Sequence, residues 1–314
     1  MDDPVTAETP RHRIGIVGAG DIARKVYFPL LGTDPGIEIV AVASRTRAKA
    51  EALAQRYRLP EVCDTVTEVL ARRPDIVFVH AGTAAHAEIV GECLDAGVHV
   101  YVDKPLSEDL AEVERLTLRA ADLGLLLAVG FNRRFAPMVR AAVDAVPAPT
   151  MIVAEKHRKS LQARPARETV HDDLIHVVDL AVWAGGLTAQ GDVSAVVRSE
   201  GGRLLAAALT VTAPAGFAQV SMARDAGQDF ERLFLAGDGV SATVDDLDTA
   251  VLRSAGSTQT RSFGSWDDIL VRRGFSGVVG HVLESLEKPE RCEVSAAAVL
   301  DTHRITDRIA RAVV

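Results

Sequence analysis

The feature that most constrains the fold is the alternation of short apolar runs with amphipathic stretches from residue 13 to residue 131. The apolar runs are nearly continuous, which is typical of strands buried on both faces of a parallel sheet. The stretches between them have helical spacing, and several end at a glycine. This part of the chain is therefore expected to form a doubly wound α/β domain. The expected strands are residues 14–17, 37–43, 75–80, 98–102 and 125–129, and the expected helices are residues 21–31, 47–57, 84–96 and 110–123.

The pattern changes after residue 131, and the length of 314 residues also suggests two domains. A helix is expected over residues 170–183, and alternating runs follow it. Short turns at residues 200–202 and 237–239 join consecutive runs and favour antiparallel pairing. We expect a polar tail over 1–12, a first domain over 13–131 and an α+β second domain over 132–314. Its expected strands are residues 151–156, 193–199, 204–212, 218–223, 231–236 and 239–245, and a closing helix is expected over 295–314.

A glycine-rich segment, GAGDIA at residues 18–23, follows the first expected strand and opens the first expected helix. It has the Gly-x-Gly-x-x-Ala form of the dinucleotide fingerprint of Rossmann domains. Glycine lets the backbone approach a pyrophosphate, which then lies against free N–H groups at the helix start. A plain tight turn is the alternative, but the position between strand and helix favours a dinucleotide. The expected cofactor-binding residues here are Gly18, Gly20, Asp21, Ile22 and Ala23.

The end of the second expected strand indicates which dinucleotide would bind. An NAD-selective site usually has a carboxylate here for the ribose 2′-hydroxyl, and residues 43–47 contain none. Ser44, Arg45 and Arg47 instead place a hydroxyl and two guanidinium groups where NADP carries its extra phosphate. We expect NADP(H) as the cofactor ahead of NAD(H), although such residues also occur at an ordinary solvated helix start.

Two further segments carry groups that can transfer protons. Lys104, in Asp103-Lys104-Pro105, follows the fourth expected strand at the sheet edge where doubly wound folds bind ligands. Its ammonium group can polarise a carbonyl oxygen or exchange a proton with an alcohol. Asp172 and His176 are spaced i, i+4 on the expected helix, so that the carboxylate can orient the imidazole. A lysine in a loop and a solvated helix start are the plain alternatives. A metal site is disfavoured, because the segment lacks the i, i+4 pair of histidines.

Composition excludes several classes of protein. The formal net charge is −8, which argues against nucleic-acid binding. No apolar run approaches the roughly 20 residues that a transmembrane helix needs. The first ten residues lack the features of a secretory signal, so we expect a cytoplasmic protein without a membrane partner. The three cysteines suggest neither a disulfide framework nor a zinc site.

The order of these motifs resembles the Gfo/Idh/MocA family of oxidoreductases, from about residue 13 to the final helix. The fingerprint, residues 103–106, residues 130–137 and the Asp172-x-x-x-His176-x-x-Asp179 segment carry the resemblance. Its MviM-like branch is the nearer match, by residues 78–80, 83–86, 156–158, 174–179 and 272–275 and by Trp266. The resemblance implies a Rossmann domain, a second domain with a large open sheet, and a substrate cleft between them. It also implies a homodimer or homotetramer that forms through that sheet.

The resemblance also implies roles for individual residues. Lys104 would contact the reacting oxygen and the nicotinamide ribose, and Asp103 replaces the family's usual Glu before it. His176 would be the general acid or base, with Asp172 as its partner on the substrate side. The residues implied to line the cofactor are Thr83, His86 and Asn132.

The chain departs from the family pattern around Asp172. Many members have a run of glycines before this aspartate and a glycine between it and the histidine, where this chain has residues 167–171 and 173–175. The substrate side of the pocket is therefore expected to differ. His157 and Arg158, at the end of an expected strand, are candidate substrate contacts whose charge would suit a carboxylate or a phosphate.

Together these features predict an NAD(P)-dependent oxidoreductase that acts on a small molecule. The expected reaction interconverts an alcohol and a carbonyl of a sugar, a cyclitol or a related compound, with His176 supplying the proton for reduction. A reductase of a non-sugar carbonyl or imine in secondary metabolism is one alternative. A non-catalytic dinucleotide-binding regulator is the other, and the joint presence of Lys104, Asp172 and His176 argues against it.

Overall fold

The computed structural model describes residues 12–214 and 216–313, and its first sheet is parallel throughout. The six strands have the order β3-β2-β1-β4-β5-β6 that is typical of dinucleotide-binding domains. The expected doubly wound sheet is confirmed. Its strands are β1 (His12–Val17), β2 (Ile37–Ala43), β3 (Val62–Cys63), β4 (Ile76–Val79), β5 (His99–Val102) and β6 (Leu127–Val129).

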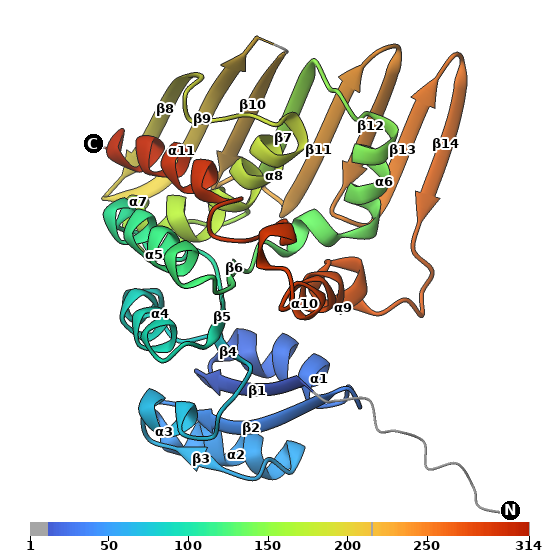
Figure 1. The fold of residues 1–314 in the computed structure, drawn as a ribbon. Helices are drawn as coiled ribbons and strands as arrows, with labels where there is room; N and C mark the ends of the chain where they lie inside the picture. The colour runs from blue at the N-terminus through green and yellow to red at the C-terminus, as the bar shows by residue number, and fades with distance from the viewer. Residues whose placement is uncertain (1–11, 215, 314) are drawn as a thin grey trace, which may run out of the picture.

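Helices cover both faces of this sheet (Figure 1). The first expected helix is divided into a π-helical turn, η1 (Ala23–Tyr27), and α1 (Phe28–Leu31). The sequence analysis missed β3 and α3 because both are very short. The other helical segments are α2 (Arg47–Tyr57), α3 (Val66–Leu70), the 3-10 turn η2 (Thr83–Ala85), α4 (His86–Asp95) and α5 (Leu110–Leu123).

The second sheet has eight strands in the order β14-β13-β12-β11-β7-β10-β9-β8. Only the β7–β10 pair is parallel, which confirms a mostly antiparallel sheet. Positive φ angles at Gly201, Gly202, Asp238 and Gly239 confirm the two expected tight turns. The strands are β7 (Met151–His157), β8 (Asp192–Glu200), β9 (Arg203–Ala213), β10 (Gly216–Ala223), β11 (Phe230–Gly237), β12 (Val240–Asp245), β13 (Thr249–Ser254) and β14 (Ser257–Ser262).

Helices pack on one face of the second sheet. Figure 1 shows α6 (Pro137–Ala145), α8 (Ile175–Gly185) and α11 (Leu300–Arg311) on this face, and α9 (Ile269–Arg272) and α10 (Phe275–Glu284) nearer the first sheet. The helix expected over residues 170–183 is confirmed in outline, as α7 (Ala166–Thr169), a π-helical turn η4 (Val170–Leu174) and α8. None of the helices in the described part of the chain has the length and apolarity that a bilayer crossing requires.

The closing helix begins later than expected, at Leu300 instead of residue 295. The residues before it lie along the free edge of β6, where the N–H of Val129 donates to the Val294 carbonyl at 2.8 Å. The N–H of Ala296 donates to the Leu127 carbonyl at 2.7 Å. An exposed strand edge has unpaired backbone groups, and here these groups bind the end of the chain. Residues 1–11 of the expected tail and residue 314 lie outside the described residues.

A buried ion pair holds the segment after β6 against the helices of the second sheet. Arg134, in the 3-10 turn η3 (Asn132–Phe135) that follows β6, donates from Nε to Oδ2 of Asp179 on α8 at 2.9 Å. Thr302 on α11 donates to the other carboxylate oxygen at 3.0 Å, and Arg134 also donates to the Glu293 carbonyl at 2.7 Å. The sequence analysis had placed Asp179 in the motif with His176, but in the structure it binds Arg134 instead.

Replacing Asp179 is expected to destabilise the fold. In an Asp179→Ala variant the buried guanidinium of Arg134 loses its carboxylate, which costs about 3–5 kcal/mol of unfolding free energy. Urea denaturation followed by circular dichroism measures this loss. Asp192→Ala, at an exposed position on β8, is the control and should change the free energy by less than about 0.5 kcal/mol. Equal effects of the two substitutions would contradict a special role for Asp179.

Candidate active site

The carboxyl ends of the first sheet's strands meet at one edge, and the expected site residues follow them there. In a sheet of this order, ligands bind beside this edge where the strand order reverses, here between β1 and β4. A cavity of about 460 Å³ lies at this point. Of the expected cofactor-binding residues, those that line it are Gly18, Gly20, Ser44 and Arg45.

Gly18 is required at the base of this cavity. Its φ angle is +111°, and a Cβ atom there would lie 2.3 Å from the carbonyl carbon of His80. No side chain caps the helical turn that follows, and Asp21 points its carboxylate at Arg24 and Lys25. Hydrogen bonds from Lys25 and Arg24 lower the pKa of Asp21. The glycine-rich turn thus has the open backbone that a pyrophosphate needs.

The two arginines after β2, Arg45 and Arg47, make different contacts. Within the described chain, the Arg45 guanidinium makes no hydrogen bond or ion pair and lies free at the cavity wall. Arg47 is instead held by Glu51 at 2.9 Å and by Asp64 at 2.5 Å, and it does not line the cavity. Both arginines were expected to face the cofactor phosphate, but of the two only Arg45 lines the cavity.

Neither Thr83 nor His86 lines this cavity. Thr83 begins the turn η2. The ring nitrogens of buried His86 lie 2.9 Å from the Pro105 carbonyl oxygen and 3.1 Å from the Ala81 carbonyl oxygen. His86 therefore connects the loops after β4 and β5. The sequence motif correctly located it near the site, but its contacts are with the backbone.

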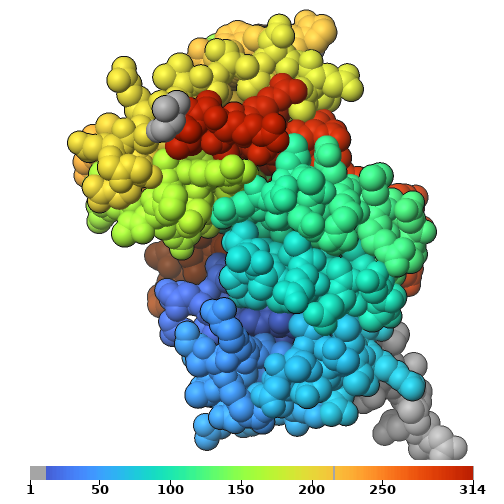
Figure 2. Space-filling model, turned by 90° about the vertical axis from the view of Figure 1, so that its left-hand side faces the viewer, coloured from blue at the N-terminus to red at the C-terminus, as the bar shows by residue number. Residues whose placement is uncertain are grey.

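A second cavity, of about 340 Å³, lies beside Ile22 of the fingerprint. The space-filling view shows a hollow between the blue first part of the chain and the yellow-green part above it (Figure 2). Residues from both parts line the cavity: Ile22, Asp103, Lys104, Asn132, Arg133, Asp172, Asp173, His176, Arg273 and Phe275. Six of these were named from the sequence. We call this space the central cavity.

Lys104 and Asp172 form an ion pair across the central cavity. Lys104 Nζ donates to Asp172 Oδ1 at 2.9 Å, and Arg164 donates to the other oxygen of Asp172 at 2.7 Å. The Lys104–Pro105 peptide bond is cis. Burial raises the pKa of Asp103, which accepts a hydrogen bond from the N–H of Lys104 at 2.9 Å. Asp172 was expected to orient His176, but its carboxylate binds the two cations.

His176 presents a neutral imidazole to the central cavity. Its Nδ1 is buried and has no hydrogen-bond partner among the described residues. Burial lowers its pKa well below 6.5, and the nearby charges of Arg133, Lys156 and Lys104 lower it further. A neutral imidazole can accept a proton from an alcohol.

The π-helical turn η4 explains why Asp172 and His176 do not pair. A π turn has one more residue than an α-helical turn, so side chains four apart no longer share a face. Asp173 points inward instead and binds Lys156 and Arg224. Burial opposes ionisation of Asp173, but the charge of Lys156 lowers its pKa to about 2.

The sequence analysis missed a group of buried charged residues behind the central cavity. Arg133 donates to Glu231 from two nitrogens, one at 3.0 Å. Burial opposes the charge of Glu231, yet Arg133 and Lys156 lower its pKa to about 2. Burial lowers the pKa of Lys156 to about 7. A signal was present, because Lys156 and Glu231 occupy inward-facing positions in the alternating patterns of β7 and β11.

His157 and Arg158, the expected substrate contacts, do not line the central cavity. His157 accepts a hydrogen bond from the N–H of Ala223 at 3.1 Å and stacks on Phe230. Arg158 lies 3.6 Å from Asp173 and contributes to the charge behind the cavity. Within the described residues, no three His, Cys, Asp or Glu side chains form a metal site.

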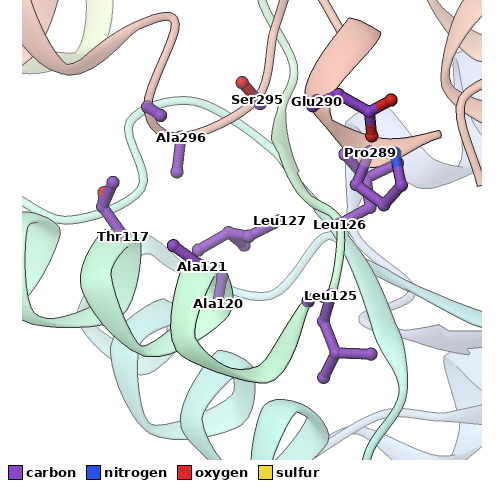
Figure 3. A pocket seen from close by; sticks show the side chains of 12 residues that line it. Thr117, Ala120, Ala121, Leu125, Leu126, Leu127, Pro289, Glu290, Ser295 and Ala296 are labelled. Carbon is purple, nitrogen blue, oxygen red and sulfur yellow. The ribbon is translucent and has the colours of Figure 1, made fainter.

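A third cavity, of about 360 Å³, lies between α5, β6 and the segment before α11 (Figure 3). Small and aliphatic side chains form most of its wall. Among the described residues that line it, Glu290 alone is ionisable. It offers no pair of groups for proton transfer, and the central cavity remains the candidate active site.

Comparisons with known proteins agree with this geometry. Residues 12–131 match the oxidoreductase family with an NAD-binding Rossmann fold (GFO_IDH_MocA), and residues 137–255 match the YceM-like C-terminal domain. The protein named YceM from Salmonella typhimurium is 35% identical over 300 residues, which cover 95% of this chain and 97% of that protein. The dTDP-3,4-didehydro-2,6-dideoxy-alpha-D-glucose 3-reductase of Actinomadura kijaniata is 34% identical over 145 residues, 46% of this chain and 43% of that protein.

A solved structure extends the likeness to the whole fold. The crystal structure of a dehydrogenase, MviM, from Clostridium difficile has a TM-score of 0.89 at 28% identity. The match covers 96% of this chain and 99% of that one. The fold, the site at the sheet edge and these relatives together place the chain in the Gfo/Idh/MocA family of oxidoreductases.

Proposed function

We propose that the protein is an NADP(H)-dependent dehydrogenase or reductase that interconverts an alcohol and a carbonyl on a small polar molecule. One observation carries this proposal: Lys104 and His176 face the same cavity at the end of the dinucleotide cradle. A bound nicotinamide ring supplies the hydride acceptor or donor of such a reaction. The sugar reductase among the relatives supports a sugar, a cyclitol or a related compound as substrate.

Two side chains manage the proton and the charge on the reacting oxygen. In the oxidising direction, the neutral imidazole of His176 accepts the hydroxyl proton, and the ammonium of Lys104 stabilises the negative charge that develops on the oxygen. In the reducing direction, the protonated imidazole returns the same proton. Asp172 holds Lys104 in position by their ion pair.

The lining of the central cavity favours this substrate class over the alternatives. Most of its side chains are charged or polar, and Ile22 and Phe275 are its apolar members. An apolar carbonyl or imine would leave these groups unpaired. A regulator without catalysis would not need the proton-transferring pair.

The second sheet is also the proposed subunit interface of a homodimer or homotetramer. The face of the sheet opposite α8 and α11 is uncovered in the single chain (Figure 1). Its strand β8 carries Val196, an apolar side chain that is 63% exposed.

Removing the proton-transferring groups is expected to abolish most of the turnover. Lys104→Ala and His176→Ala should each lower kcat by about 10²- to 10⁴-fold, because each removes acid–base or electrostatic assistance. Stopped-flow nicotinamide fluorescence on a turned-over substrate measures this loss, and NADPH titration verifies that the cofactor still binds. Lys159→Ala, at an exposed lysine, is the control. Unchanged turnover in both Lys104→Ala and His176→Ala would contradict the catalytic roles proposed for these two residues.

Cofactor preference is expected to depend on Arg45. Arg45→Ala removes the free guanidinium at the cavity wall and should weaken NADPH binding by about tenfold or more, with little change for NADH. Fluorescence titration with both reduced cofactors gives the ratio. Arg56→Ala, an exposed arginine further along α2, should leave the ratio as it is. Tighter binding of NADH by the unaltered protein would contradict the NADP(H) proposal.

The pH dependence is expected to reflect the low pKa of His176. Because burial and the surrounding cations lower this pKa, the imidazole stays neutral down to a pH well below 6.5. The kcat/KM for oxidation should therefore stay level as the pH falls from 8 to 6.5, and it should decline only in more acid buffer. An acid limb centred near 6.5 would show that His176 titrates with an ordinary pKa or does not act as the base.

A further inference from the structure

Arg273 is a cation of the central cavity that the proposed reaction does not use. It follows α9 and lines the central cavity together with Lys104 and His176. Arg273 is exposed to solvent, and within residues 12–214 and 216–313 its guanidinium makes no hydrogen bond and no ion pair. Its neighbour Arg272 is different, because Arg272 is bound to Asp248.

The backbone around Arg273 is held firmly against the site. The side-chain amide of Asn132 donates to the Arg273 carbonyl oxygen at 2.7 Å. Gly274 has a φ angle of +78°, and a Cβ atom there would lie 2.2 Å from the Asn132 carbonyl oxygen. Only glycine allows this close approach. The free guanidinium therefore extends from an anchored backbone rather than from a loose loop.

Most carboxylates around the central cavity are already bound by cations other than Arg273. Glu231 is taken up by Arg133, and Asp173 is shared by Lys156, Arg158 and Arg224. Asp172 is likewise shared by Lys104 and Arg164. Of the described carboxylates that line the cavity, none binds Arg273. The described lining holds three cations, Lys104, Arg133 and Arg273, and three carboxylates, Asp103, Asp172 and Asp173. Arg273 is the cation among them that makes no ion pair.

The pKa directions agree with a cation that lacks a bound partner. Partial burial lowers the pKa of Arg273, the charges of Arg133 and Arg158 act in the same direction, and those of Glu231 and Asp246 oppose them. Burial also lowers the pKa of His176, and four cations lower it further. Each of these shifts would be reduced by a negative charge placed in the cavity.

We propose that the guanidinium of Arg273 binds an anionic group of the substrate, a carboxylate or a phosphate ester, while the reacting carbon of the same molecule lies beside Lys104 and His176. A guanidinium suits both groups because its planar fork donates two parallel hydrogen bonds. This inference rests on the proposed function and narrows the substrate to an acidic hydroxy or oxo compound. The cavity of about 340 Å³ has room for a molecule of hexose size.

The test measures equilibrium binding and needs no turnover. Isothermal titration at constant ionic strength compares D-glucose, D-gluconate, D-glucose 6-phosphate and inorganic phosphate, each with and without NADPH. The unaltered protein should bind at least one anionic probe about tenfold or more tightly than glucose. The two sugar anions distinguish a carboxylate site from a phosphate site.

Substitutions of Arg273 test whether this side chain causes the preference for an anionic probe. Arg273→Gln should weaken the preferred anion by about 10- to 100-fold, and Arg273→Lys should restore part of the loss because the charge remains. NADPH affinity and any binding of glucose should stay the same. Arg261→Gln removes the same charge from exposed β14 and should bind the anion like the unaltered protein.

Three outcomes would overturn the inference: no preference for any anionic probe, equal losses in Arg273→Gln and Arg261→Gln, or an equal loss of NADPH affinity in Arg273→Gln. Failure of the proposed function looks different. Anion binding through Arg273 without any hydride transfer would remove the proposed reaction and keep the anion site. Hydride transfer on a substrate, without any preference for an anionic probe, would keep the proposed reaction and remove the anion site.

Discussion

The buried ion pair between Arg134 and Asp179 is the contact on which the geometry of the central cavity depends. A charge in the interior is costly unless a partner neutralises it, so this pair forms only when η3, α8 and α11 lie together. Asp179 lies about one turn beyond His176 on α8, and Arg134 follows Asn132 closely in η3. The same contact therefore stabilises the core and fixes the imidazole relative to the end of the first sheet. Proton-transfer geometry and folding are coupled through one carboxylate.

The charges behind the central cavity are bound to one another. Arg133 is paired with Glu231, and Asp173 is shared by Lys156, Arg158 and Arg224. Such pairs hold the wall rigid because each partner would be costly to expose alone in the interior. At the cavity surface Lys104 is paired with Asp172, whereas Arg273 has no such partner among the described residues and its charge is available to a ligand. This arrangement also keeps His176 neutral without a carboxylate beside it. The imidazole is thus tuned by desolvation and distant cations rather than by a partner of the kind that its sequence motif suggested.

Much of the fold could be predicted from sequence because its signals are local. Buried parallel strands give continuous apolar runs, and the fingerprint marks the first strand–helix turn. β13 and β14 were missed because neither alternates along its length: β13 has one buried residue, Ala250, and β14 is exposed throughout. The site was predicted in part: Lys104, Asp172 and His176 do converge, but the partner of Asp172 was wrong because spacing alone cannot reveal a π turn. The contacts of Arg47 and of His157 depend on residues distant in sequence, such as Asp64 and Ala223, which no local pattern identifies.

The edge of β6 links the order of synthesis to the order of folding. Its backbone partners, Val294 and Ala296, leave the ribosome long after the rest of the first sheet. At ordinary rates of translation, the delay is on the order of ten seconds. During that time the nucleotide-binding half has an open strand edge, so the nascent chain is exposed to edge-to-edge association. A chain truncated between β14 and Val294 would contain both sheets, but the edge of the first would still be unpaired.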